Sequence, residues 1–205
     1  MQNTKWLFFD LGSTLIDETE CIKKRCDVII KNNNLDKDEF YSKVKECAIT
    51  DSCAVKVAAA YYGAEMPRWY GELERLYPNT ENVLEKLSQK YKLGIIANQV
   101  AGTQERIDNW GIGKYFDVVV ASAEAGCSKP DLKIFNNALE QANCKSNEAV
   151  MIGDRLDNDI VPAKQLGMKT VWVRQGLAVF QNIKNASEKP DYIINNISEI
   201  TAIFH

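Results

Sequence analysis

The chain has 205 residues, enough for one α/β domain with a small second lobe but not for two full-sized domains. An apolar fraction of 45% and a charged fraction of 26% exclude a disordered or fibrous chain. The 25 basic and 28 acidic residues form no long block of one sign, which excludes the usual charge pattern of a protein that binds nucleic acid or an anionic membrane. A small molecule is therefore the expected partner.

Cysteine and histidine offer little for catalysis or metal binding. The six cysteines form no Cys-x-x-Cys pair, and the single histidine is the last residue, His205, so few ligands are available for zinc. The lone histidine also excludes Ser-His-Asp and Cys-His catalysis. No apolar stretch is long enough for a signal peptide or a spanning helix, which predicts a cytoplasmic protein. Any catalysis must use carboxylates, lysines or a metal.

Short apolar runs alternate with helical stretches along the chain. This alternation predicts a parallel sheet with helices on both faces, and the nearly continuous apolarity of the runs is typical of strands buried on both sides. Ligands of such folds bind at the carboxyl ends of the strands, so the residues that follow each run are candidates for a site. The runs are residues 6–9, 93–97, 118–121, 149–152, 170–173 and 192–194.

The segment 17–78 interrupts the alternation, because it holds helix-forming material and no convincing strand. We predict an all-helical cap of residues 17–78, inserted after the first strand over an α/β core of residues 1–16 and 79–205. The alternative is that these helices simply pack on the sheet.

The stretch FFDLGSTLID, residues 8–17, places Asp10 directly after the first strand. Gly12 lets the following backbone amides turn around this carboxylate, which is then placed to attack phosphorus or carbon as a nucleophile. A turn aspartate that caps its own loop is the alternative.

The loop after the fourth strand, GDRLDND, gathers Asp154, Asp157 and Asp159 within six residues. Acids this close repel one another unless a cation or hydrogen bonds hold them, and a hard divalent ion such as Mg²⁺ is the economical explanation. The alternative is an acidic helix start favoured by the helix dipole, with Arg155 pairing with one of the acids.

Two weaker candidates follow the second and third strands. Asn98 and Gln99 could hold an anion through their amides, although an asparagine after a strand is usually part of a turn. In CSKPD, Lys129 precedes Pro130 and therefore cannot continue a helix. A lysine fixed there could neutralise both the nucleophile and a bound phosphate, whereas a lone surface lysine is normally solvated.

The fragments FFDLGSTLID, LGIIANQ, SKPDLKIF and VMIGDRLDNDI resemble, in order and spacing, the four sequence motifs of the haloacid dehalogenase (HAD) superfamily. The inserted helices resemble the cap of the subgroup that includes phosphoglycolate phosphatase and 2-haloacid dehalogenase. The resemblance implies an α/β fold with a Rossmann-like parallel sheet and a small helical cap, and a Mg²⁺-dependent hydrolase acting on a small phosphorylated metabolite.

The resemblance also implies a role for each motif position. Asp10 matches the nucleophile that forms an aspartyl-phosphate, Lys129 matches the orienting lysine, and Asp157 is better treated as a helix-start residue. The implied Mg²⁺ ligands are Asp10, the main-chain carbonyl of Gly12, Asp154 and Asp159, and the implied substrate contacts are Ser13, Thr14, Asp17, Ala97 and Asn98.

Two positions depart from the family pattern. Most phosphatases of the family carry, where this chain has Gly12, a second aspartate that protonates the leaving oxygen and then activates water, and general acid–base catalysis is worth about 10²–10⁴ in rate. Ala97 stands where the family usually has serine or threonine, so a hydrogen bond to the transferring group is lost unless Ser13, Thr14 or Thr103 replaces it.

These departures leave several functions open. The leading expectation is a phosphatase that is slow, or restricted to acyl and aryl phosphates whose leaving group needs no proton. A dehalogenase or a phosphonatase-type enzyme would likewise need no leaving-group acid. A degenerate protein that binds a phosphorylated metabolite without turning it over is the non-enzyme alternative.

Overall fold

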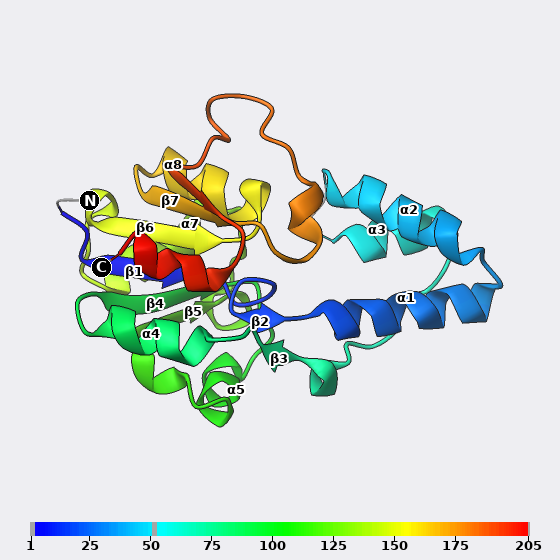
Figure 1. Cartoon of the computed structure of the whole chain (residues 1–205), viewed down its shortest axis with the longest axis horizontal. Coiled ribbons are helices and arrows are strands. Elements are labelled where there is room, and N and C mark those ends of the chain that lie inside the picture. Colours follow the sequence, from blue (N-terminus) through cyan, green and yellow to red (C-terminus); the bar gives the residue numbers. More distant parts are fainter. Residues whose placement is uncertain (1–2, 51–52, 205) are drawn as a thin grey trace.

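The computed structural model describes residues 3–50 and 53–204, and its main feature is a six-stranded sheet in the order β5-β4-β1-β6-β7-β8 (Figure 1). All neighbouring strands in this sheet are parallel. The predicted parallel sheet is confirmed, and each predicted strand agrees with the observed one within a residue at either end. The strands are β1 (Trp6–Phe9), β4 (Lys92–Ala97), β5 (Val118–Ala121), β6 (Ala149–Gly153), β7 (Lys169–Val173) and β8 (Tyr192–Ile194).

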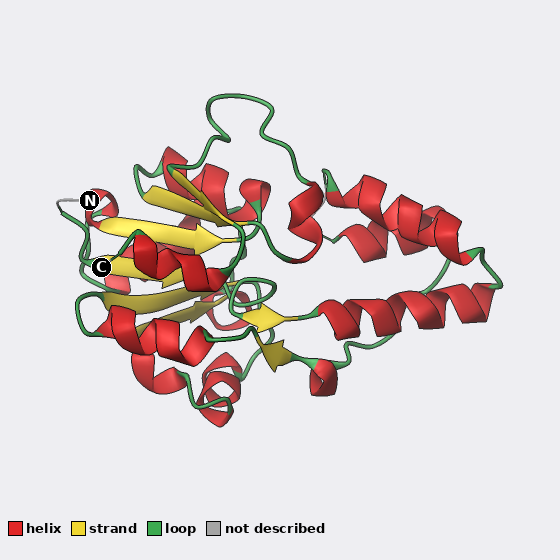
Figure 2. Ribbon diagram, in the orientation of Figure 1, coloured by secondary structure: helices red, strands yellow, loops and turns green. Residues whose placement is uncertain are grey.

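Helices cover both faces of the sheet because successive strand residues point to opposite sides (Figure 2). Leu7 and Phe9 of the central strand β1 belong to a core with residues of α4 (Thr80–Ser88) and α5 (Thr103–Asn109). Phe8 belongs to the opposite core, with α7 (Leu132–Gln141) and α8 (Val161–Gln165). The short helix α6 (Ser122–Ala125) follows β5.

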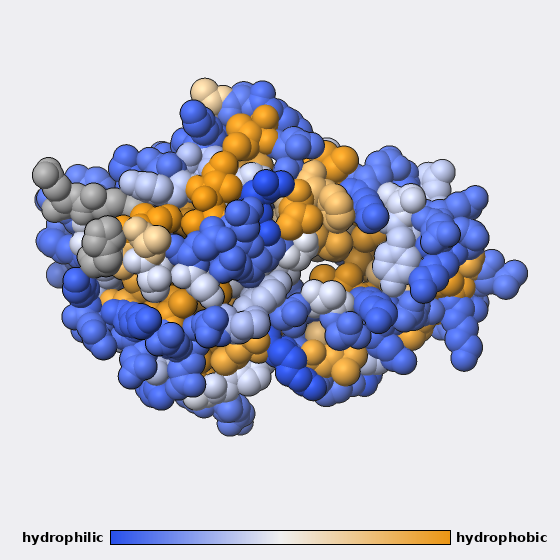
Figure 3. Space-filling model, viewed as in Figure 1, coloured by the Kyte–Doolittle hydropathy of each residue, from blue (hydrophilic) through white to orange (hydrophobic). Residues whose placement is uncertain are grey.

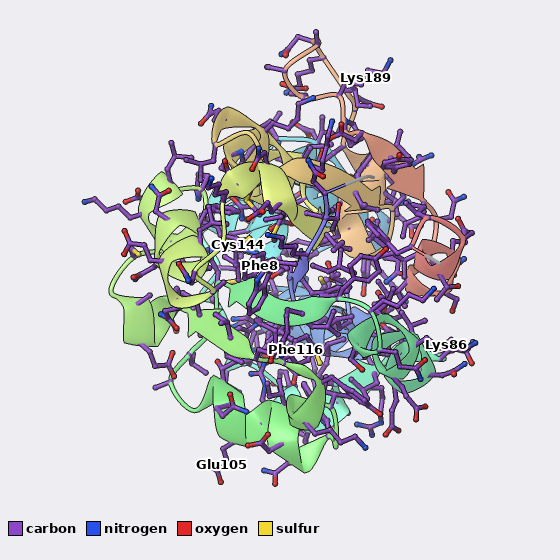
Figure 4. The ribbon with its side chains drawn as sticks, turned by 90° about the vertical axis from the view of Figure 1, so that its left-hand side faces the viewer. Phe8, Lys86, Glu105, Phe116, Cys144 and Lys189 are labelled. Atoms are coloured by element: carbon purple, nitrogen blue, oxygen red, sulfur yellow. The ribbon has the colours of Figure 1, made fainter. Side chains whose placement is uncertain are left out.

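The two faces bury the central strand completely. Leu7, Phe8 and Phe9 have no exposed surface. Burial of each such side chain contributes roughly 1.5–3 kcal/mol to the stability of the fold. In Figure 4, which views the molecule from the end away from the helical lobe, Phe8 lies in the interior while Lys86 and Glu105 lie at the periphery. The strand that precedes Asp10 is therefore a rigid support for it.

The segment after β1 forms a helical lobe of α1 (Thr19–Asn33), α2 (Lys37–Ala48) and α3 (Ala54–Tyr61). These helices have their own hydrophobic cluster, to which the core contributes the partly buried Leu177 and Phe180. They project away from the sheet in Figure 1, and in Figure 3 apolar residues gather where the lobe meets the core. The helices do not pack on the sheet, but the division of the chain at residues 17 and 78 stays a prediction.

Two very short strands within and beside this segment were not expected. β2 (Ile16–Asp17) and β3 (Arg75–Leu76) pair antiparallel, with Asp17 opposite Arg75. The expectation that 17–78 holds no strand is therefore wrong at its two ends, because two-residue strands are too short to leave a periodic pattern. The β2–β3 pair thus links the segment by which the chain leaves the core to the segment by which the chain returns to it.

Within the described ranges, no helix is both long enough and apolar enough to cross a bilayer.

Candidate active site

The carboxyl ends of three neighbouring strands bring the sequence candidates together. β1 lies between β4 and β6, so Asp10, Asn98 and Asp154 each follow a strand at the same edge of the sheet. They open onto a cavity of about 190 Å³ between the core and the helical lobe. The cavity lining also includes Gly12, Ser13, Glu18, Ile22, Gln99, Lys129, Arg155, Asn158, Leu177 and Ala178.

Lys129 connects the first motif to the fourth. Its Nζ donates to Oδ1 of Asp10 at 2.6 Å and to Oδ1 of Asp159 at 2.7 Å, and only 2% of its side chain is exposed. Burial disfavours the charged form of Lys129, but the two carboxylates outweigh burial and raise the pKa of the ammonium. The lysine therefore stays protonated and offsets part of the negative charge around Asp10.

Asn98 positions this lysine through its side-chain amide. Its Oδ1 accepts from the backbone N–H of Lys129 at 2.7 Å, and its Nδ2 donates to the carbonyl of Lys129 at 2.9 Å. Both polar atoms of the amide are thus used in holding the lysine loop. We infer that Asn98 acts on the site through Lys129, a link between residues 31 positions apart that the sequence does not reveal.

The acids of the fourth motif lie against the nucleophile candidate. One oxygen from each of Asp10, Asp154 and Asp159 lies within 4.8 Å of the other two, and all three residues are buried. A side chain at Gly153 would meet the carboxylate of Asp159 at 2.3 Å, so only glycine leaves room for the acid there. The backbone N–H of Arg155 donates to Oδ2 of Asp159 at 3.0 Å and fixes its orientation.

The negative charge of Asp10, Asp154 and Asp159 suits a divalent cation. Three clustered carboxylates face the ammonium of Lys129, which leaves a buried excess of negative charge that a divalent metal ion would balance. Burial, with the charges of Asp10 and Asp159, raises the pKa of Asp154. Asp154 also accepts a hydrogen bond from Thr14 Oγ1 at 3.4 Å, which ties the first loop to the fourth.

Asp157 lies outside this cluster. Its two oxygens accept hydrogen bonds from Nε and Nη2 of Arg155 at 2.9 and 2.8 Å, and Gln181 donates a further bond at 2.8 Å. The residue lies in the first part of a π-helical turn, Leu156–Ile160, that leads into α8. Asp157 thus orders the start of a helix and is separate from the group of three acids.

The expected substrate contacts divide into two groups. Ser13 and Asn98 line the cavity, whereas Thr14, Asp17 and Ala97 do not appear in its lining. Asp17 instead accepts from the backbone N–H of Thr19 at 2.9 Å, and Thr14 and Ala97 are completely buried.

The hydroxyl of Thr103, a possible replacement for the hydroxyl missing at Ala97, is already engaged in a hydrogen bond. It donates to the carbonyl of Val100 at 3.0 Å, and the residue is buried. Of the hydroxyl side chains considered, Ser13 is the one that reaches the cavity.

Glu18 lines the same cavity and was not a sequence candidate. It follows β2 directly and precedes α1, and its Oε2 accepts from Ser13 Oγ at 3.3 Å. Burial, together with the charges of Asp10 and Glu74, raises the pKa of Glu18 to about 7. One feature of the sequence could have indicated Glu18: it is an acid a few residues after the first motif, which has glycine instead of aspartate at position 12.

A second cavity adjoins the first on the side of the helical lobe. Its volume is about 450 Å³, and the two share Glu18, Ile22 and Leu177 in their linings. The second cavity is mainly apolar, with Met66 and Trp69 among its lining residues. A charged group held among the acids and Lys129 could therefore carry a less polar remainder into the lobe.

Comparisons with known proteins give one family. Residues 7–173 match the model of the haloacid dehalogenase-like hydrolases. A glyceraldehyde 3-phosphate phosphatase of Pyrococcus abyssi is 32% identical over 195 residues, which cover 84% of this chain and 82% of that protein. A glyceraldehyde 3-phosphate phosphatase of Methanocaldococcus jannaschii is 38% identical over 133 residues, which cover 64% of this chain and 57% of that protein.

The match to the second relative spans little more than half of its length. Among solved structures, a HAD phosphatase from Thermococcus onnurineus superposes with a TM-score of 0.66 at 27% identity, and the match covers 98% of this chain and 97% of that one.

Proposed function

The chain belongs to the haloacid dehalogenase-like hydrolases, and from this premise we propose that it is a Mg²⁺-dependent phosphatase that acts on a small phosphorylated metabolite through an aspartyl-phosphate. The observation that supports this proposal most is the position of Asp10. Its carboxylate follows a buried strand, contacts the ammonium of Lys129 at 2.6 Å, and lies beside Asp154 and Asp159 at a cavity.

The chemistry follows from these contacts. A carboxylate oxygen of Asp10 forms a bond to phosphorus, the bond from phosphorus to the leaving oxygen breaks, and the electron pair stays on that oxygen. Lys129 holds Asp10 in place and offsets charge that gathers on the transferring group. Water then attacks phosphorus, the bond to Asp10 breaks, and inorganic phosphate leaves.

We propose that the metal is held by Asp10, Asp154, Asp159 and the main-chain carbonyl of Gly12. The clustered carboxylates suit a hard cation, and the backbone N–H of Arg155 holds one of them, that of Asp159, in place. When bound, Mg²⁺ would neutralise these acids and the oxygens of the phosphoryl group.

The cavities suggest the size of the substrate. The first, of about 190 Å³, suits a phosphoryl group, and the second, of about 450 Å³, would take a small organic remainder. Relatives named glyceraldehyde 3-phosphate phosphatase make a three-carbon phosphate the first substrate to test. We expect a cytoplasmic protein whose partner is such a metabolite rather than a nucleic acid or a membrane.

We also propose that residues 17–78 are a cap domain over a core of residues 1–16 and 79–205. The two connections between lobe and core lie side by side in the β2–β3 pair. Met66 and Trp69 belong to this segment and line the second cavity. The cap would therefore select the organic part of the substrate.

The test is a phosphate-release assay on the purified protein with p-nitrophenyl phosphate, acetyl phosphate and glyceraldehyde 3-phosphate. We expect turnover that needs Mg²⁺, stops in EDTA and is lost in Asp10→Asn. Failure of all three substrates would contradict the proposal. Beryllofluoride binding without turnover would instead favour a degenerate metabolite-binding protein, and halide release from a 2-haloacid would favour a dehalogenase.

A further inference from the structure

The space beside Gly12 is filled by a carboxylate from another part of the chain. A Cβ built on Gly12 would lie 2.7 Å from Oε1 and 2.9 Å from Oε2 of Glu18. The backbone of Gly12 is not in the left-handed region, so the conformation itself does not require glycine. A side chain at position 12 would therefore meet the carboxylate of Glu18, which is the end of a flexible side chain and would have to move aside.

Local contacts hold Glu18 in this place. It lies between β2 and α1, and Ser13 Oγ donates to its Oε2 at 3.3 Å. Glu18 and Asp10 line the same cavity. The carboxylate therefore faces the space where a phosphoryl group on Asp10 would sit.

Hydrolysis of an alkyl phosphate in this cavity would require a proton donor. The alkoxide that leaves an alkyl phosphate is strongly basic, and its departure is easier when a positioned acid gives it a proton. The ionisable residues in the cavity lining are Asp10, Glu18, Lys129, Asp154 and Arg155.

Four of these residues already have other tasks. Asp10 is the proposed nucleophile, Lys129 is held between two carboxylates, Asp154 is a proposed metal ligand, and Arg155 is bound to Asp157. A guanidinium is in any case too weak an acid to serve. Glu18 is the remaining candidate.

We propose that Glu18 is the general acid and base of this site and supplies the carboxylate that position 12 lacks. The inference rests on the proposed phosphatase function. The protonated carboxyl of Glu18 gives its proton to the leaving oxygen as the P–O bond breaks and Asp10 bonds to phosphorus. The carboxylate then takes a proton from water as the water oxygen bonds to phosphorus and Asp10 leaves, which restores both residues.

The first experiment compares wild type with Glu18→Gln on an alkyl ester, glyceraldehyde 3-phosphate, and on p-nitrophenyl phosphate. We expect kcat for the alkyl ester to fall about 10²–10⁴-fold. The leaving group of p-nitrophenyl phosphate needs no proton. With this substrate we expect a burst of one nitrophenolate per enzyme molecule, followed by slow turnover. The burst separates a lost base from a merely structural defect, which would slow both phases. Exposed Glu20 supplies the matched control, Glu20→Gln, with unchanged rates.

The second experiment moves the carboxylate. Glu18→Ala removes it and opens the space beside position 12, and Gly12→Asp with Glu18→Ala puts a carboxylate back there. We expect the double variant to regain at least about tenfold in kcat for the alkyl ester over Glu18→Ala. Gly12→Asp alone would crowd Glu18 and serves as the comparison.

The outcomes distinguish the two proposals. If wild type turns over and Glu18→Gln behaves like Glu20→Gln on both substrates, Glu18 is not the acid–base group, while the phosphatase assignment stands. Failure of the double variant to exceed Glu18→Ala would also count against the assigned position. Absence of Asp10-dependent turnover in wild type would overturn the function and this inference together.

Discussion

Replacement of Lys129 by methionine tests the electrostatics of the site, because it removes the ammonium between two buried carboxylates. Nζ lies 2.6 Å from Asp10 and 2.7 Å from Asp159, and 2% of the lysine side chain is exposed. Removal of one partner from a buried ion pair costs about 3–5 kcal/mol, since the remaining charge is left uncompensated. We expect a loss of about 3 kcal/mol in the free energy of unfolding, the lower end of that range, because methionine keeps the apolar packing.

Urea unfolding in EDTA and in Mg²⁺ measures this loss. We expect Mg²⁺ to restore part of it, because a divalent cation supplies positive charge to the same acids. Lys92→Met is the matched control: Lys92 contacts Asp117 at 2.6 Å, but 65% of its side chain is exposed. Such a surface pair contributes about 0–1 kcal/mol. Equal losses in the two variants would refute the reasoning.

Three further predictions concern two acids, Asp154 of the site and Asp191 outside it, and Gly153. Asp154→Asn is expected to raise the urea midpoint of the metal-free protein, because it removes one of three clustered carboxylates, and to abolish stabilisation by Mg²⁺ in the same titration. Asp191→Asn is expected to cost about 1 kcal/mol at pH 7, after allowance for its exposure. Burial opposes ionisation of Asp191, but the hydrogen bonds that it accepts outweigh burial and lower its pKa. This stability is present above the unfolded pKa and lost as the pH falls through the folded pKa, so urea curves of wild type and variant should converge in acid, and a constant gap would contradict the argument. Gly153→Ala is expected to cost about 1–3 kcal/mol in urea and to weaken Mg²⁺ binding measured by calorimetry, because its methyl group would displace Asp159; unchanged binding would show that the close contact does not matter.

The sheet could be predicted from the sequence because its strands are buried on both faces. A strand such as β6 reads as an uninterrupted apolar run, and each run was found within a residue of its observed ends. The strands β2 and β3 could not be found, because two residues carry no periodic signal. Their pairing depends on the return of the chain from the helical lobe.

The chemistry-bearing residues could be found, but not all of their contacts. Asp10, Lys129 and Asp154 each follow a strand or precede a proline, so local sequence places them. The use of Asn98 to hold Lys129 depends on a hydrogen bond between distant loops, which no local pattern encodes. Glu18 was missed for a related reason: its distance from position 12 is set by the turn between β1 and β2 and not by sequence spacing.

The central claim is that Asp10 receives a phosphoryl group. The most direct measurement is mass spectrometry of the peptide that contains Asp10 after acid quenching of Glu18→Gln during turnover of p-nitrophenyl phosphate. The account predicts one phosphoryl group on that peptide, present with Mg²⁺ and absent in EDTA or in Asp10→Asn. A stoichiometric burst of nitrophenolate that needs Mg²⁺ while Asp10 stays unmodified at every quench time would contradict it.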